Sequence, residues 1–186
     1  MVAVFPQKHL TDIAEWHRMG EADIFPADSR LELIEGEILR KSPIGSNHAG
    51  HIARLINFLV VLIQGQAIAN EQNLIQLGDL SEPQPDFVLL RPEASFYTTR
   101  HPVAVDVLLL VEVSDSTLRF DRSQKLHLYA HHAIPEYWIV NLIDNCLEVY
   151  RQPQDGDYLD QTLLFQADSL TLQALPDVRI AVSSIL

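Results

Sequence analysis

The chain has 186 residues, 47% of them hydrophobic, which is enough for one well-buried core but short for two, so we expect a single domain over residues 1–186. Its single cysteine, Cys146, excludes an internal disulfide, and its apolar segments are too short to cross a bilayer, so we expect a cytoplasmic protein without a membrane span. The formal net charge of −12 argues against a broadly basic DNA-binding face and by itself favours a small-molecule enzyme or an interaction module.

The first predicted elements are a short helix and a hairpin. Residues 10–20 (LTDIAEWHRMG) are typical of a helix that Thr11 caps and a glycine ends. Residues 31–43 (LELIEGEILRKSP) contain two short apolar runs on either side of Glu35-Gly36, and this pattern indicates a hairpin.

Residues 46–70 contain the best helical pattern of the chain. Ser46 can cap this helix, and apolar side chains recur at steps of three and four residues, so they share one face. These side chains are Ile52, Leu55, Ile56, Leu59, Leu62 and Ile63.

Three apolar runs follow that are typical of strands: residues 74–78, 85–91 and 103–114. Residues 116–132 then place apolar side chains at helical spacing and predict another helix. This alternation already mixes strands with helices along the chain.

The last third is predicted to be mainly strand. Residues 135–142 and 146–152 are rich in aromatic and β-branched residues, and the short polar connection between them predicts a hairpin. A turn at 155–158 leads to further short strands and a helical turn. The order of elements predicts an α/β fold with a mixed central sheet and helices on its faces.

Glu112 is the first residue that packing does not explain. It lies in LLLVEVSDST (108–117), whose apolar residues are those of a strand covered on both faces. Burying a carboxylate costs several kcal/mol unless it is paired. A glutamate in this strand therefore needs a partner or a function.

Asp86 raises the same question at the start of an apolar strand, although a turn residue that bonds its own backbone is the simplest explanation. Strands that follow one another are usually neighbours, so Asp86 and Glu112 could converge. Converging carboxylates repel unless a proton or a cation lies between them. A Mg²⁺ ion would suit both and could position a nucleophilic water, whereas a raised pKa on one carboxylate would suit proton transfer.

Lys125 favours the metal alternative. It lies on the helix that follows the strand of Glu112, beside side chains that are expected to point inward. Its ammonium could orient a bound water and stabilise negative charge at phosphorus. The competing interpretation is an exposed lysine that pairs weakly with Asp121, four residues earlier.

The order of these residues resembles the PD-(D/E)XK nuclease superfamily. The stretches that carry the resemblance are PDFVLL (85–90), LLLVEVSDST (108–117) and RFDRSQKLHLYAHHAIPEYWIVN (119–141), and residues 31–55 resemble the first hairpin and helix of the same proteins. Within the superfamily the chain is most similar to a large bacterial group labelled restriction endonucleases of unknown function. The stretches cover most of the chain, and their order and spacing are fairly specific.

The usual lysine of the superfamily stands two residues after the acid, where this chain has Ser114. The resemblance is therefore to variants whose lysine has moved to the next helix, with Lys125 as the candidate. It implies a restriction-endonuclease-like fold, Asp86 and Glu112 as ligands of Mg²⁺ (or Mn²⁺), and Lys125 assisting the attacking water. It also implies a homodimer.

Two residues upstream are candidates for supporting roles. His48, near the start of the long helix, is suited to contact a phosphate or the bound water. Glu35, in the hairpin, is a candidate additional metal ligand, with Glu32 and Glu37 as competitors and an exposed hairpin as the default.

Two residues of the later helix complete the candidate set. Asp121 is expected to fix Lys125, and Tyr129 is expected to pack inward with its hydroxyl satisfied nearby.

The sequence predicts a Mg²⁺-dependent endonuclease that hydrolyses DNA phosphodiester bonds. One alternative is a non-catalytic module that binds protein or nucleic acid with the same fold, which the acidic charge favours. The other is a metal-dependent hydrolase of a smaller phosphate compound, which an acidic surface would tolerate better.

Overall fold

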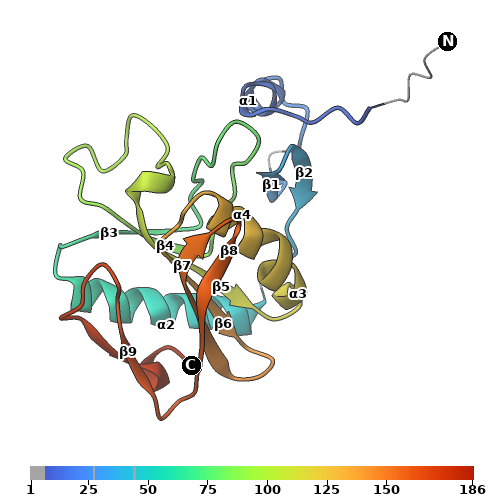
Figure 1. Cartoon of the computed structure of the whole chain (residues 1–186). Helices are drawn as coiled ribbons and strands as arrows, with labels where there is room; N and C mark the ends of the chain where they lie inside the picture. The colour runs from blue at the N-terminus through green and yellow to red at the C-terminus, as the bar shows by residue number, and fades with distance from the viewer. Residues whose placement is uncertain (1–6, 27, 44) are drawn as a thin grey trace.

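A six-stranded mixed sheet forms the centre of the computed structural model, which describes residues 7–26, 28–43 and 45–186. In chain order its strands are β3 (Ile68–Glu71), β4 (Phe87–Leu90), β5 (Val107–Ser114), β6 (Glu136–Asn141), β7 (Cys146–Gln154) and β8 (Asp157–Leu164). They lie side by side in that same order (Figure 1); β5 and β6 are parallel, and the other neighbours are antiparallel. The predicted α/β class with a mixed central sheet is confirmed.

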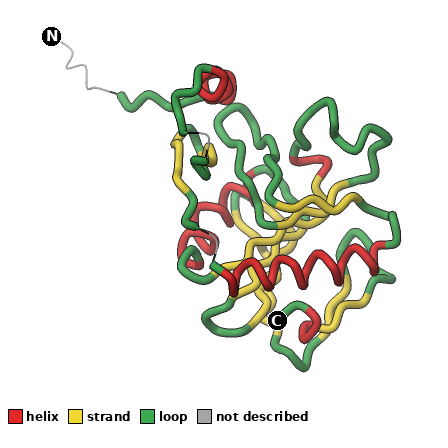
Figure 2. The backbone as a smooth tube through the Cα atoms, turned by 180° about the vertical axis from the view of Figure 1, so that it is seen from behind, coloured by secondary structure: helices red, strands yellow, loops and turns green. Residues whose placement is uncertain are grey.

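Helix α2 (Ser46–Ile63) covers one face of the sheet, as Figure 2 shows from behind. Its buried side chains, among them Leu55 and Leu59, pack in one core cluster with Val111 and Trp138 of the central strands. The C-terminal segment completes the cover of this face with β9 (Ser169–Thr171), β10 (Arg179–Ala181) and the short helix η3 (Val182–Ser184).

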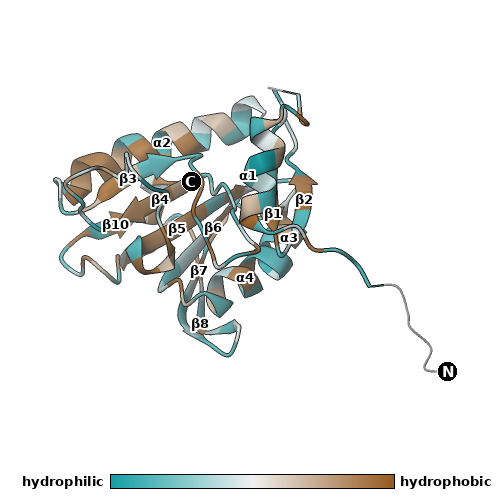
Figure 3. Cartoon of the chain, turned by 90° about the horizontal axis from the view of Figure 1, so that it is seen from above, coloured by the Kyte–Doolittle hydropathy of each residue, from teal (hydrophilic) through white to brown (hydrophobic). Residues whose placement is uncertain are grey.

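The other face is covered by one continuous helical segment that contains α3 (Leu118–Phe120), the π-helical turn η2 (Asp121–Lys125) and α4 (Leu126–His131). Tyr129 of this segment packs edge-on against Tyr137 of β6, with ring centroids 5.0 Å apart. Figure 3 shows hydrophobic residues along the central strands, where both layers meet the sheet. This double cover explains the apolar composition of β4, β5 and β6.

A separate hairpin lies at one end of the sheet and consists of β1 (Leu31–Ile34) and β2 (Glu37–Arg40). Its turn is at Glu35-Gly36, as the sequence predicts. Helix α1 (Ile13–Glu21) lies beyond it, and its N-cap is Asp12 instead of the predicted Thr11. Asp12 is the favoured cap because Glu15 lies three residues later and completes a capping box with it.

The long helix ends earlier than its apolar pattern suggests. Gln64 has a left-handed backbone with φ of 46°, which ends α2 at Ile63, and residues 68–71 form β3 in place of more helix. The N-cap is Gly45, so Ser46 is the first helical residue and makes no capping hydrogen bond. The apolar residues of 68–71 suit a strand as well as a helix, and hydrogen bonding with β4 determines that they form a strand.

Two predicted strands are shorter in the structure. Residues 74–78 form only isolated bridges, although Ile75 and Leu77 are fully buried in the core. Residues 104–106 form a short helical turn, η1 (Ala104–Asp106), before β5 begins. At 74–78 the apolar residues indicate burial correctly and strand pairing incorrectly, whereas at 104–106 Val105 is exposed as well as unpaired.

Across the residues that the structure describes, every helix falls short of the length and hydropathy that a bilayer crossing needs.

Candidate active site

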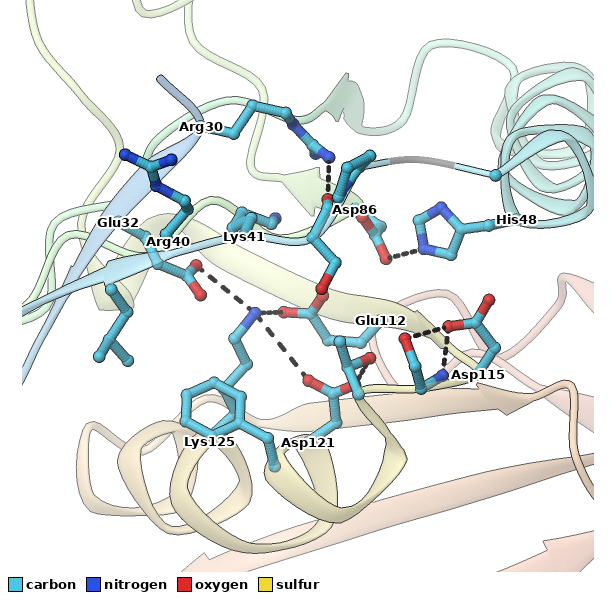
Figure 4. Close-up of a pocket in the computed structure, with 17 residues that line it drawn as sticks. Arg30, Glu32, Arg40, Lys41, His48, Asp86, Glu112, Asp115, Asp121 and Lys125 are labelled. Carbon is cyan, nitrogen blue, oxygen red and sulfur yellow. Dashed lines mark hydrogen bonds and ion pairs between the residues drawn. The ribbon is translucent and has the colours of Figure 1, made fainter. Parts of the chain in front are cut away.

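A cavity of about 420 Å³ opens between the β1–β2 hairpin and the ends of β4 and β5; we call it the central cavity (Figure 4). Most of its charged lining comes from residues that sequence reasoning singled out. These are Glu32, His48, Asp86, Glu112, Asp121 and Lys125.

The pairing of β4 with β5 brings the first two acids together. Phe87 lies opposite Val111 in this antiparallel pair, so the next residue outward, Asp86, lies opposite Glu112. Opposed residues of an antiparallel pair point to the same face of the sheet. The two carboxylates therefore enter the central cavity side by side.

Asp86 is held from two sides. Its Oδ2 accepts a hydrogen bond of 2.9 Å from the backbone amide of Val113 and lies 3.0 Å from Nε2 of His48. Residue 113 belongs to β5 and residue 48 to the first turn of α2, so the sheet and the long helix fix one carboxylate together. His48 thus contacts the acid, where sequence reasoning expected a phosphate or a water.

Glu112 is buried because it has two specific donors. Its Oε1 accepts 2.9 Å from Nζ of Lys125 and 2.8 Å from the hydroxyl of Tyr129. Both donors come from the helical segment that covers this face of the sheet. A buried carboxylate with a charged and a neutral donor avoids the cost of an unpaired charge.

Lys125 is the last residue of the π-helical turn and is only 3% exposed. Besides its contact with Glu112, its Nζ lies 3.5 Å from Oε2 of Glu32 and 4.0 Å from Oδ1 of Asp121. Single π-helical turns are rare and are frequent at functional sites. The lysine is therefore a buried cation among three carboxylates.

Asp121 is fixed mainly by hydroxyl groups. Its Oδ2 accepts hydrogen bonds of 2.7 Å from Ser114 Oγ and 2.6 Å from Thr117 Oγ1. Ser114 stands where the superfamily usually has its lysine, and here its side chain supports the helix from which Lys125 extends. The expected pairing of Asp121 with Lys125 exists only as the loose 4.0 Å contact.

The two opposed carboxylates have different pKa values. Burial raises the pKa of Glu112 to about 7; Lys125 opposes this rise, and the nearby Asp86 adds to it. Burial also works to raise the pKa of Asp86, but the hydrogen bond with His48 and the charge of Lys41 bring it below its usual value. Such divergence between neighbouring acids is a feature of functional sites.

Lys125 and His48 both favour their charged forms. Burial works to lower the pKa of Lys125, but Glu112, Glu32 and Asp121 together raise it above its usual value. The pKa of His48 is raised, chiefly by its hydrogen bond with Asp86. Two cationic groups therefore offset part of the negative charge of the acids.

Glu35 lies outside the central cavity, which corrects its placement as a candidate ligand. It occupies the hairpin turn with a left-handed φ of 50°, is exposed, and its Oε2 accepts a hydrogen bond from Gln124. Glu32, weighed as its competitor, is 3% exposed and lines the cavity from β1. The position along the hairpin explains the difference: Glu32 lies near the open end, which lines the cavity, whereas Glu35 lies in the turn beyond the end of β1.

The donor set fits a hard divalent cation in one specific way. Asp86 Oδ1 and Glu112 Oε2 form no hydrogen bond with the described residues. Neither oxygen is a fully buried atom without a partner, so both are accessible from the cavity. In the described ranges, no cluster of three or more His, Cys, Asp or Glu is arranged to hold a metal. Mg²⁺ is often held by one or two carboxylates, with water and substrate phosphate completing the shell.

Sequence reasoning left three cations of the cavity wall unassigned: Arg30, Arg40 and Lys41. The run LRKS at residues 39–42 was the available signal, but only the tertiary structure places Arg40 and Lys41 at the cavity, across from Asp121 and Lys125.

A mixed sheet with opposed acids on two central strands, and a lysine on the following helix, is the arrangement expected from the resemblance to PD-(D/E)XK nucleases whose lysine has moved to the next helix. The chain belongs to the Uma2 family, described as "Putative restriction endonuclease", whose sequence model matches residues 13–183. The fold is similar to that of a crystal structure of "a putative nuclease belonging to DUF820" from Anabaena variabilis ATCC 29413. That likeness has a TM-score of 0.71 at 15% identity and covers 90% of this chain and 96% of the other. No curated protein matches the chain significantly.

Proposed function

We propose that this chain is a divalent-metal-dependent endonuclease that hydrolyses DNA phosphodiester bonds in the central cavity. The observation that carries the proposal is the pairing of Asp86 with Glu112 across β4 and β5, each with one oxygen open to the cavity, beside the buried Lys125. Membership of the Uma2 family, which is described as "Putative restriction endonuclease", supports the same reaction class.

Each side chain has a distinct role in this proposal. Asp86 and Glu112 would hold Mg²⁺ (or Mn²⁺), which when bound supplies a Lewis acid and an activated water. His48 and the amide of Val113 keep Asp86 oriented through their contacts of 3.0 and 2.9 Å. Orientation of this kind reduces the reorganisation that the reaction requires.

Lys125 would act on the phosphate. An ammonium has three donors, and one of them is used by Glu112 at 2.9 Å. The contacts with Glu32 and Asp121 are longer, at 3.5 and 4.0 Å, so a phosphate oxygen in the cavity can compete for the remaining donors. A fixed positive charge there stabilises the negative charge that develops at phosphorus.

The deciding experiment is plasmid cleavage with Mg²⁺, with Mn²⁺ and with EDTA, using wild type, Asp86→Asn and Glu112→Gln. Both substitutions keep the side-chain shape and remove a ligand charge, so we expect cleavage to fall by about 100-fold or more. Asp79→Asn is the matched control, because Asp79 is exposed and lies outside the cavity lining. Cleavage that survives EDTA, or that Asp86→Asn leaves intact, rules the proposal out.

A smaller phosphate ester is the second candidate substrate. A volume of about 420 Å³ is typical of small-ligand sites, and a net charge of −12 repels long polyanions outside the cavity. A panel of nucleotides and simple phosphodiesters, assayed beside plasmid DNA, separates the two. Turnover of the small esters alone would favour this candidate.

A homodimer remains a prediction for this protein. Two copies related by a two-fold axis would present two cavities, one for each strand of a duplex. Sedimentation velocity over a range of concentrations measures the mass directly. A monomer at micromolar concentration would contradict the prediction.

A further inference from the structure

The wall of the central cavity that faces the acids carries three cations. Arg30 precedes β1, Arg40 ends β2 and Lys41 follows it; we call these three residues the hairpin wall. The amide of Lys41 donates to the carbonyl of Arg30 at 2.8 Å, so the two ends of the hairpin lie together. Figure 4 shows the three side chains on the opposite side of the cavity from Asp121 and Lys125.

The hairpin wall differs from the cations that pair directly with buried acids, because its side chains form no close ion pair. Within residues 7–26, 28–43 and 45–186, none of its three side chains forms an ion pair with a carboxylate. Arg122 and Arg151, by contrast, bind Glu148 and Glu136 closely. Other arginines, such as Arg54 and Arg91, also form no ion pair with a described carboxylate, but the hairpin wall gathers three such cations at one cavity of a protein with a net charge of −12.

The protein contacts of the hairpin wall use only carbonyl groups. Arg30 Nη1 donates to the carbonyl of Ser42 at 2.6 Å, and Lys41 Nζ donates to that of Gln84 at 2.5 Å. Arg40 is exposed and makes no side-chain hydrogen bond with the described residues. These contacts orient two cations and leave the charge of all three available to a ligand.

Lys41 also lies close to the candidate metal ligands, because its Nζ is bound to the carbonyl of Gln84, two residues before Asp86, and it lines the same cavity as Asp86 and Glu112. A phosphate between the acids and the hairpin wall would therefore contact both. The distant surface acids matter less, since salt screens exposed charges beyond about 8 Å at physiological ionic strength.

We propose that the hairpin wall binds the phosphodiester backbone of the substrate strand, next to the phosphate at Asp86 and Glu112. This inference rests on the proposed function, because it assigns the cavity to a nucleic-acid strand. It explains how an acidic protein could hold a polyanion: the positive charge is confined to one wall of the site. Arg40 and Lys41 would supply charge to neighbouring phosphates, and Arg30 would close the inner end of the wall.

The test is a binding measurement that does not depend on turnover. Fluorescent oligonucleotides, one single-stranded and one duplex, are titrated in EDTA at several salt concentrations with wild type and with the double variant Arg40→Gln/Lys41→Gln. We expect the double variant to bind about 10-fold more weakly. The slope of log Kd against log salt should fall by about 1.4 for a single strand, because each lost phosphate contact contributes about 0.7. Comparison of the two probes identifies which form of DNA the wall holds.

Two further variants separate this effect from general charge and folding effects. Arg18→Gln removes one positive charge from the exposed side of α1 and should leave binding within about two-fold of wild type. Lys41→Arg keeps the charge and should bind like wild type, with a melting temperature that shows the fold intact. If wild type does not bind, or if the double variant binds like Arg18→Gln, the proposal is wrong.

The outcome is distinguishable from that of the proposed function. Cleavage that needs Asp86 but not the hairpin wall leaves the nuclease proposal standing and overturns this one. Binding that needs the hairpin wall, without any cleavage, supports the wall and overturns the nuclease.

Discussion

Glu112 and Lys125 are each 3% exposed, and each offsets the free-energy cost of burying the charge of the other. Removing one partner of a buried ion pair leaves the other charge without solvent and without a counter-ion. The pair is unusual because the lysine serves three acids and the glutamate has a second donor in Tyr129. Stability and the candidate chemistry therefore depend on the same side chains.

Lys125→Met should be strongly destabilising. It leaves Glu112, Glu32 and Asp121 buried around a neutral side chain, so we expect the free energy of unfolding at pH 7 to fall by about 3–5 kcal/mol. Urea denaturation measures it. Lys8→Met is the control, because Lys8 pairs with Glu37 at the surface and such pairs contribute about 1 kcal/mol or less. Equal effects of the two substitutions would show that the buried pair has no special role in stability.

Tyr129→Phe isolates one hydrogen bond of Glu112. The ring keeps its edge-on packing with Tyr137, and only the donor to Oε1 is lost. At pH 9, above the raised pKa of Glu112, we expect a loss of about 1.5–3 kcal/mol of unfolding free energy, the range for bonds to charged groups. Tyr158→Phe is matched to it, because that buried hydroxyl donates to the neutral carbonyl of Ile134 and should cost only about 1 kcal/mol. The reverse order would contradict a charged Glu112.

At the scale of secondary-structure elements, the β1–β2 hairpin positions both Glu32 and the hairpin wall. It is attached to the rest of the molecule by backbone hydrogen bonds at its turn: Thr11 donates to the carbonyl of Gly36, and Gly36 donates to that of Leu80. Gly36 has a φ of 79°, and an added Cβ would lie 2.6 Å from Cβ of Leu10. Only glycine fits this turn without moving the hairpin.

Gly36→Ala should therefore lower both stability and cleavage. The left-handed backbone costs about 1–2 kcal/mol with alanine, and the clash with Leu10 adds about 1–3 kcal/mol. Gly156→Ala is the matched control, because its φ is 83° and nothing lies within 4 Å of the added Cβ, so only the backbone cost applies. Thermal unfolding and the plasmid assay read the two effects, and indistinguishable variants would contradict the attachment of the hairpin through Leu10.

Element boundaries show which parts of the fold the sequence predicts well. The hairpin at 31–43 and the pairing of β6 with β7 follow from local turn and strand signals, and both are confirmed. The end of the helix predicted at 46–70 cannot be predicted from local signals, because residues 68–71 form β3 through hydrogen bonds with β4, a strand later in the chain. Local pattern cannot weigh such non-local pairing.

At the scale of the whole molecule, a polar network joins the π-helical turn to the β6–β7 hairpin. Arg122 binds Glu148 at 2.7 Å, and Glu148 also accepts hydrogen bonds from Asn141 and Tyr150. Burial works to raise the pKa of Glu148, but these donors bring it below its usual 4.5. The network thus connects the segment that carries Lys125 to β6 and β7 on the face of the sheet that this segment covers.

Glu148→Gln should reveal this coupling through its pH dependence. Because the folded-state pKa is lower than the unfolded one, the carboxylate stabilises the fold fully above pH 4.5 and loses this effect as the pH falls through the folded value. The variant should be less stable than wild type at pH 7, and the difference should shrink towards pH 3. Urea denaturation at both pH values measures it, and Glu71→Gln on the exposed edge is the control. A difference that grows in acid would contradict the lowered pKa.

The sequence alone determined the α/β class, the central strands and the three principal candidates, because these depend on local periodicity and on polar residues that are out of place in apolar runs. The approach of Asp86 to Glu112 was foreseeable as well, since neighbouring strands usually pair. The roles of these residues in catalysis remain predictions that the assays above test.

Only the tertiary structure decided which other groups share the cavity. It selected Glu32 over Glu35, attached His48 to Asp86, and brought Arg30, Arg40 and Lys41 opposite the acids. Each of these choices depends on strand register and on the way the hairpin docks against the sheet. Both are set by contacts between residues far apart in the chain, and no local pattern contains that information.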